Sequence, residues 1–164
     1  MKNDNNKNIL ITALDKILKN YFFKRKNSSF LRKSDDCMLI LNIQKSIYSD
    51  NFYINIAIWL RGIYDIAWPK EMECHIRIRA GHIVSNQLQL ESSLNFDNGI
   101  MTIDERIDYI TGIIVNEILP FMLKLDSITG IKNGLTDGKW NKKALIHKDL
   151  YEFLDIPIII RSNN

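Results

Sequence analysis

Apolar and polar residues alternate with a period of two through the middle of this chain, and this feature constrains its fold more than any other. The alternation is most regular over residues 52–60, where Phe52, Ile54, Ile56 and Ile58 fall on one face and Tyr53, Asn55, Ala57 and Trp59 on the other. Residues 37–45 have the same rhythm and follow residues 30–33 across the turn residues Ser34-Asp35-Asp36. This arrangement predicts antiparallel strands joined by hairpins.

Two further segments extend the predicted sheet. Residues 74–84 alternate again, and their polar positions His75, Arg77 and Arg79 share one face, which predicts a third long strand. The mixed pattern of residues 87–96 predicts an edge strand that ends at a turn. We therefore expect a sheet of about four strands.

Helical periodicity marks both ends of the chain. Residues 1–7 form a polar leader that we expect to be flexible, and apolar residues then recur at helical spacing over residues 9–22. A Thr-x-x-Glu capping box opens a long helix over residues 102–125, which Pro120 is expected to kink or divide. The pattern of residues 144–154 predicts a last helix.

This order of elements is typical of an α+β fold, with an antiparallel sheet of about four strands and with an N-terminal helix and C-terminal helices packed on one face. The chain has 164 residues, of which 46% are hydrophobic, so residues 1–164 are expected to form a single domain around one core. No stretch approaches the length of a membrane span.

Charge and cysteine usage limit the classes of function. The formal net charge is only +3, which is too small to mark a nucleic-acid-binding protein. The two cysteines, Cys37 and Cys74, are isolated and lack zinc-ligand spacing, so we expect a reduced, cytoplasmic protein with no metal and no cofactor. The basic residues 24–26 follow a helical stripe and are interpreted as a solvated loop, with nucleic-acid binding as the less favoured reading.

Four short segments in a fixed order resemble a known family. They are Phe22-Phe23-Lys24-Arg25-Lys26, Phe30-x-Arg32, Asn42-Ile43-Gln44-Lys45-Ser46 and Phe52-x-Ile54-Asn55-Ile56. Together they are similar to the bacterial domain-of-unknown-function family 4304, and the resemblance covers about residues 9–84 well and the helical half loosely. It implies a compact bacterial cytoplasmic protein, and it implies no established catalysis.

Polar residues on the predicted strands form the candidate binding site. Alternation places amide, imidazole and guanidinium groups on one side of three strands, and a lysine follows at a strand end. These residues are Asn42, Gln44, Lys45, Asn55, His75, Arg77 and Arg79. Such a set suits a carboxylate, a phosphate or an acidic protein surface, because arginine forms paired hydrogen bonds to anions. The alternative is a solvated sheet face whose side chains pair across strands.

The sequence contains no nucleophile with an adjacent base in a recognisable motif, so an enzyme is the less favoured class and we name no catalytic residue. We expect a non-catalytic protein-binding module, such as an immunity protein that caps an acidic toxin domain. The alternative is a small-anion or nucleic-acid binder that uses the basic sheet face. The sequence leaves a homodimer open.

Overall fold

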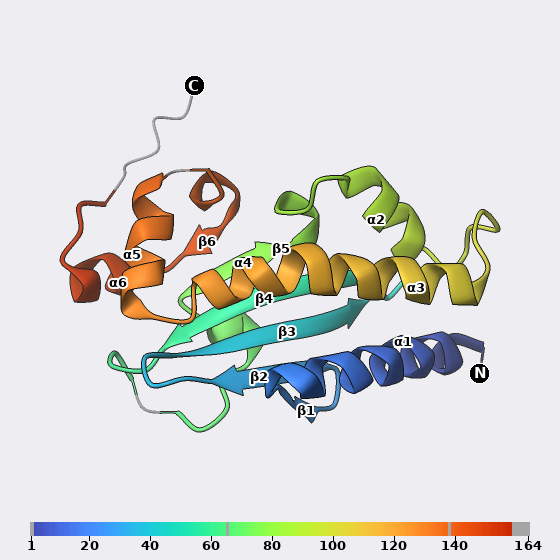
Figure 1. The fold of residues 1–164 in the computed structure, drawn as a ribbon, viewed down its shortest axis with the longest axis horizontal. Helices are drawn as coiled ribbons and strands as arrows, with labels where there is room; N and C mark the ends of the chain where they lie inside the picture. The colour runs from blue at the N-terminus through green and yellow to red at the C-terminus, as the bar shows by residue number, and fades with distance from the viewer. Residues whose placement is uncertain (1, 65, 138, 159–164) are drawn as a thin grey trace.

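The computed structural model describes residues 2–64, 66–137 and 139–158 (Figure 1). Its helices are α1 (Lys2–Leu18), α2 (Gln87–Leu94), α3 (Ile103–Ile113), α4 (Leu119–Lys124), α5 (Ile128–Asp137) and α6 (Lys148–Leu154). Its strands are β1 (Lys24–Lys26), β2 (Ser29–Lys33), β3 (Cys37–Lys45), β4 (Phe52–Leu60), β5 (Ile76–Arg79) and β6 (Leu145–Ile146). The predicted α+β class is confirmed.

The strands form one antiparallel sheet in the order β1-β2-β3-β4-β5-β6. The sheet has more strands than the four expected, because two short strands lie at its edges. β1 was interpreted as a solvated loop, but its three basic residues pair with β2 while remaining exposed. Exposed lysines on an edge strand hinder pairing with the edge of another molecule.

Core residues lie on the sheet face that the helices cover. Leu39, Leu41 and Ile43 of β3 pair in register with Ile58, Ile56 and Ile54 of β4, as the alternation predicted. Leu10, Leu14 and Leu18 of α1 and Ile110, Ile114 and Ile118 of the long C-terminal helix join the same buried cluster. Figure 1 shows α1 and α3 running beside each other over this face, and α1 contacts α3 directly. When helices cover one face of an antiparallel sheet, the other face can contact solvent or pack against other segments.

The opposite sheet face is divided into two ends. One end is covered by a small apolar cluster that includes Met38, Ile40 and Trp59, against which Ile66 and Trp68 of the β4–β5 connection pack. The other end carries the polar positions of β3, β4 and β5 and is described below.

Pro120 divides the long helix, as predicted. Five residues before α4, Ile114–Ile118, form one π-helical turn, and Pro120 lies in the first turn of α4. Proline has no backbone N–H to donate to the preceding turn, and a wider turn accommodates the lost hydrogen bond. The capping box that opens α3 is also present, since Glu105 N donates to Thr102 Oγ1 at 3.3 Å and Thr102 N donates to Glu105 Oε2 at 2.8 Å.

Residues 87–96 were predicted as an edge strand, and this was wrong. Residues 87–94 form α2, whose N-cap Asn86 accepts a hydrogen bond from Gln89 N at 3.0 Å. The Gln-Leu-Gln-Leu sequence imitates a period of two, but Leu90 and Leu94 are four residues apart and both are buried. Helical burial of this pair overrides the local alternation.

Other element boundaries also differ from those expected. Helix α1 begins at Lys2 and so includes the segment that was expected to be a flexible leader. The strand predicted over residues 74–84 is limited to β5, because Ala80–His82 turn into a 3-10 helix. The helix predicted over residues 144–154 begins only at Lys148, because β6 precedes it.

Arg106 is a buried arginine that joins α2, α3 and the loop between them. Its side chain is among the largest that are fully buried. The guanidinium donates to the carbonyl oxygens of Ser92 at 2.9 Å, Ser93 at 3.0 Å and Met101 at 3.2 Å. It also donates to the backbone and side-chain oxygens of Asn98. Burial lowers the pKa of Arg106. All the oxygen atoms that accept these hydrogen bonds belong to neutral carbonyl or amide groups.

Candidate functional site

A row of polar residues crosses the open end of the sheet. Strand register places Ser29, Asn42, Asn55 and Arg79 opposite one another on β2, β3, β4 and β5. Asn42 Nδ2 donates to Ser29 Oγ at 2.8 Å, and Asn55 Nδ2 donates to Gln44 Oε1 at 3.0 Å. These bonds fix the amide side chains before any ligand arrives, as expected for cross-strand pairs.

Arg79 ends this row with a guanidinium group that is held in place but not neutralised. Its Cζ lies 4.3 Å from the centre of the Tyr53 ring, a cation–π contact that orients the planar fork. Arg79 is exposed, and within the described part of the chain no carboxylate lies within ion-pair distance of it. Its N–H donors are therefore available to an external anion.

Arg77, the other arginine of β5, is neutralised internally. Its Nε donates to Glu71 Oε1 at 3.0 Å and its terminal nitrogen donates to Glu71 Oε2 at 3.4 Å. This paired geometry ties β5 to the β4–β5 connection. Arg77 thus shapes the site, and Arg79 contributes the free charge.

These side chains surround a cleft of about 260 Å³. Four of the seven predicted residues line it, namely Gln44, Asn55, Arg77 and Arg79. Ile78 of β5 also lines the cleft. Glu71, His82, Lys143 and Leu145 complete the lining and were not predicted from the sequence. They come from irregular segments and from β6, and no pattern within the sequence connects them to β5. Asn42 lies in the same row but does not line the cleft.

Lys45 lies outside the cleft. Alternation places it on the core side at the end of β3, where its Nζ lies 3.3 Å from Asp50 Oδ1. Asp50 Oδ2 accepts a hydrogen bond from Asn6 of α1, and Asp50 N donates to Asp97. Lys45 therefore contributes to a junction between α1, the β3–β4 turn and the loop after α2.

His75 also lies outside the cleft, although it is on the same sheet face. It is buried at the apolar end, where its ring centre lies 4.4 Å from that of Trp59. His75 Nδ1 accepts a hydrogen bond from Leu60 N at 2.9 Å. The pKa of His75 is lowered to about 4, mainly by burial and in part by nearby His147, while Asp149 opposes the change. His75 therefore has a structural role as a neutral imidazole.

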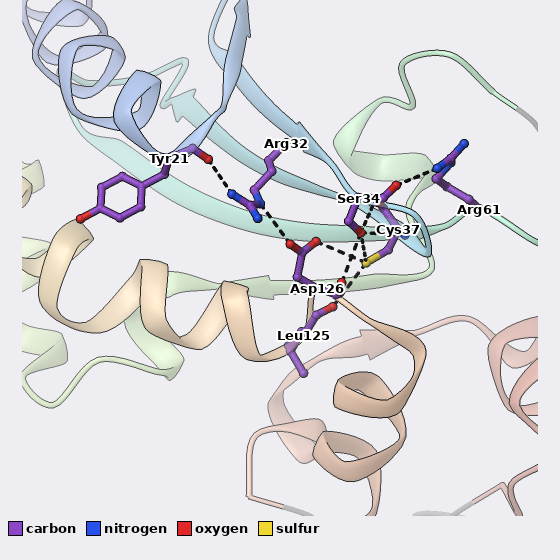
Figure 2. Close-up of polar contacts among 7 residues, drawn as sticks. All are labelled: Tyr21, Arg32, Ser34, Cys37, Arg61, Leu125 and Asp126. Atoms are coloured by element: carbon purple, nitrogen blue, oxygen red, sulfur yellow. Dashed lines mark hydrogen bonds and ion pairs between the residues drawn. The ribbon is translucent and has the colours of Figure 1, made fainter.

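A second polar cluster ties the β2–β3 turn to the junction between α4 and α5. Figure 2 shows Asp126 between Arg32 and Cys37. Arg32 Nε donates to Asp126 Oδ2 at 3.0 Å, and Cys37 Sγ lies 3.7 Å from Asp126 Oδ1. Ser34 Oγ lies 3.2 Å from the backbone oxygen of Asp126, and Arg61 donates to the backbone oxygen of Ser34 at 2.7 Å. These contacts hold the sheet against the helices.

Both cysteine thiols are expected to resist alkylation in the folded protein. The pKa of Cys37 is raised to about 12, mainly by burial and in part by the Asp126 and Asp36 carboxylates, while the hydrogen bond with Ser34 opposes the change. Burial also raises the pKa of Cys74 to about 12. Because the thiolate is the reactive form, iodoacetamide at pH 8 should modify both residues at least ~100-fold more slowly than in urea-unfolded protein. Intact-protein mass spectrometry measures both rates, and equal rates would contradict the burial described here.

Among residues 2–64, 66–137 and 139–158, no group of three or more histidine, cysteine or acidic residues is arranged to hold a metal ion. Across the same ranges, no helix combines the length and apolar character needed to cross a bilayer.

A protein-family model matches more than half of the chain. A family model described as "Domain of unknown function (DUF4304)" matches residues 14–124, which include α1 from Leu14 onward, β1 to β5, and α2 to α4. No curated protein and no solved structure matches the chain. The matched region includes the polar row and Arg79, and ends before Lys143 and Leu145 of the cleft.

Proposed function

The chain belongs to the family described as "Domain of unknown function (DUF4304)", and from this premise we propose that it is a non-catalytic protein-binding module that holds an acidic partner on its open sheet face. An immunity protein that caps a toxin domain is the form of such a module that we favour. The observation that carries the proposal is the Arg79 guanidinium, which is stacked on Tyr53 and has no anionic partner among the described residues.

The geometry around Arg79 supports recognition of a surface. The polar row lies on four neighbouring strands, and hydrogen bonds fix Asn42 and Asn55 within it. Side chains fixed on rigid strands lose little conformational entropy when a partner binds. Arg79 and Lys143 give the cleft two cations beyond the Arg77–Glu71 pair, which favours an acidic partner.

Two reactive residues close to this surface, Cys74 and His75, have structural roles, whereas His82 is exposed and lines the cleft itself. Cys74 is buried, and its Sγ donates to the Lys70 backbone oxygen at 3.4 Å. His75 uses Nδ1 to accept the Leu60 N–H and is neutral at physiological pH. A general base needs a free basic nitrogen near the reacting group.

We expect Arg79→Ala to weaken binding of the partner by about tenfold or more, because hydrogen bonds to a charged group contribute about 1.5–3 kcal/mol. The partner is captured on immobilised protein from cells of the native source, identified by mass spectrometry, and titrated as purified protein by calorimetry. Arg25→Ala is the matched control, since it removes the same charge from exposed strand β1.

Both variants should retain the stability of the parent protein, because both arginines are exposed. Equal loss of affinity in the two variants would indicate a non-specific charge effect. Unchanged affinity in Arg79→Ala would remove the open sheet face as the binding surface and would contradict the proposal.

A small-anion binder is the second candidate function, and the small volume of the cleft favours it. A volume of about 260 Å³ beside Arg79 and Lys143 can accept a small carboxylate or phosphate. In that case acetate or inorganic phosphate should shift the Arg79 side-chain signal in NMR spectra at millimolar concentration, and no stoichiometric protein partner should be captured. A nucleic-acid binder would instead show strongly salt-dependent retention on heparin.

A further inference from the structure

A second cleft adjoins the first, and Arg79 forms the wall between them. It has a volume of about 290 Å³ and shares Arg79 and His82 with the first cleft. Its other lining includes Leu90 and Leu94 of α2, together with Gly81 of the 3-10 turn. The two clefts therefore meet at Arg79 and His82 and together form one groove, whose first half also holds the guanidinium of Arg77.

The second cleft exists because β5 is shorter than β4. The last residue of β5, Arg79, pairs with Asn55, whereas β4 extends back to Phe52. The edge of β4 is next contacted at Asn51, which forms an isolated bridge with Asn95 after α2. The lining of the cleft includes Phe52, Tyr53 and Ile54 between these two contacts, together with residues of α2.

Charge differs between the two halves of this groove. The first cleft holds Arg79 and Lys143, which attract a carboxylate. The second cleft holds Glu91, whose Oε1 accepts a hydrogen bond from Gln87 Nε2 at 2.7 Å. Glu91 repels an anion placed there, whereas Leu90 and Leu94, whose side chains belong mainly to the buried core, give the cleft an apolar floor that an apolar group can contact.

From this juxtaposition, and resting on the proposed function, we propose that the partner is recognised through an acidic residue and an apolar residue two positions away in an extended segment. The acidic side chain binds Arg79 in the first cleft, and the apolar side chain enters the second cleft. Residues two positions apart in an extended chain share one face and lie about 6.6 Å apart, which suits two clefts divided by one side chain.

Synthetic peptides test this proposal directly. The probe is the acetylated and amidated heptapeptide Gly-Ser-Glu-Ser-Leu-Ser-Gly, and two matched peptides carry Gln for Glu or Ser for Leu. We expect the first peptide to shift the NMR signals of the Arg79 side chain and of the Leu90 and Leu94 methyl groups. Its affinity should exceed that of each matched peptide by about tenfold. Sodium hexanoate tests whether a small organic acid suffices, and tighter binding of hexanoate than of the peptide would overturn the proposal.

Gly81 allows the second cleft to be filled without removing a core residue. A Cβ atom at Gly81 would lie 3.4 Å from Gln87 Cγ and 3.8 Å from Glu91 Oε1, which is ordinary contact, so Gly81→Ala should fold normally. Gly81→Leu should fill the cleft and reduce the advantage of the Leu peptide over the Ser peptide by about tenfold. Gly81→Ala is the control for this variant. If Gly81→Leu fails to fold, the comparison of the three peptides on the parent protein tests the proposal by itself.

The outcomes separate this inference from the proposed function. One outcome is that Arg79→Ala loses the captured partner while the three peptides bind equally or do not bind. This outcome would overturn the proposed acidic–apolar recognition and would leave the proposed binding function supported. A partner that binds Arg79→Ala as well as the parent would overturn both. Support requires the Glu–Leu preference in the parent protein and, where Gly81→Leu folds, the loss of that preference in this variant.

Discussion

Arg106→Ala is expected to lower the free energy of unfolding by about 4 kcal/mol, the largest effect of any single substitution considered for this protein. The substitution removes a fully buried guanidinium that five oxygen atoms surround, three of them on the backbone of Ser92, Ser93 and Met101. Each buried oxygen left without a donor costs about 1–3 kcal/mol, less where water enters the space. The side chain also packs over the Phe96 ring at 5.2 Å, so the change leaves a cavity as well.

Urea unfolding followed by tryptophan fluorescence measures this effect, and two variants sharpen it. Arg106→Lys keeps the charge but has three donors on one atom, so it should recover only part of the loss. Arg25→Ala, on exposed β1, should stay within about 0.5 kcal/mol of the parent protein. A change below about 1 kcal/mol in Arg106→Ala would show that the carbonyl oxygens find other donors, and would contradict the structural role assigned to Arg106.

Acid is expected to destabilise the protein through His75 by about 3 kcal/mol. The pKa of His75 is about 4 in the folded protein and 6.5 in the unfolded chain. Above pH 6.5 the imidazole is neutral in both states, and the stability associated with it is fully present. Between pH 6.5 and 4 only the unfolded state takes up the proton, so stability falls by about 1.4 kcal/mol per pH unit as pH falls. Protonation of Nδ1 would also remove the acceptor for the Leu60 N–H.

His75→Asn isolates this contribution. Asparagine offers a side-chain oxygen as an acceptor and does not titrate, so the variant should lose less stability between pH 6.5 and 4 than the parent protein. Groups distant from residue 75 are the same in both proteins, so their effects cancel in the difference. Urea unfolding at half-unit pH intervals gives the two slopes. Parallel slopes would show that His75 is protonated in the folded state.

Much of the fold follows from local patterns, because burial of one strand or helix face leaves a periodic trace. The two faces of β3 and β4 were predicted residue by residue, since their register buries one complete set of alternate positions. The division of the long helix at Pro120 was also predictable, because the missing N–H is a property of that single residue. The helical structure of α2 was not predictable. The alternation in Gln87–Leu90 is a local pattern, whereas the burial of Leu94 depends on contacts made in the folded protein.

The site was predictable only where strand alternation determines it. Gln44, Asn55, Arg77 and Arg79 came together because they share one face of neighbouring strands. His75 shares that face, but the chain after β4 folds back over its end of the sheet, and no local signal reveals this cover. Lys143 reaches the cleft from beside β6, which is distant in sequence, so its contribution depends on the complete tertiary structure.

The consecutive strand order has a consequence for how the chain folds. Strands β1 to β4 are joined by the short connections Asn27–Ser28, Ser34–Asp36 and Ser46–Asn51, so each pairing closes a small loop at low entropic cost. The apolar β3–β4 hairpin is the natural folding nucleus, from which pairing can spread to β2 and β1. β6 can join only after the helical half has returned to the sheet, so the wall of the cleft that carries Lys143 is completed last.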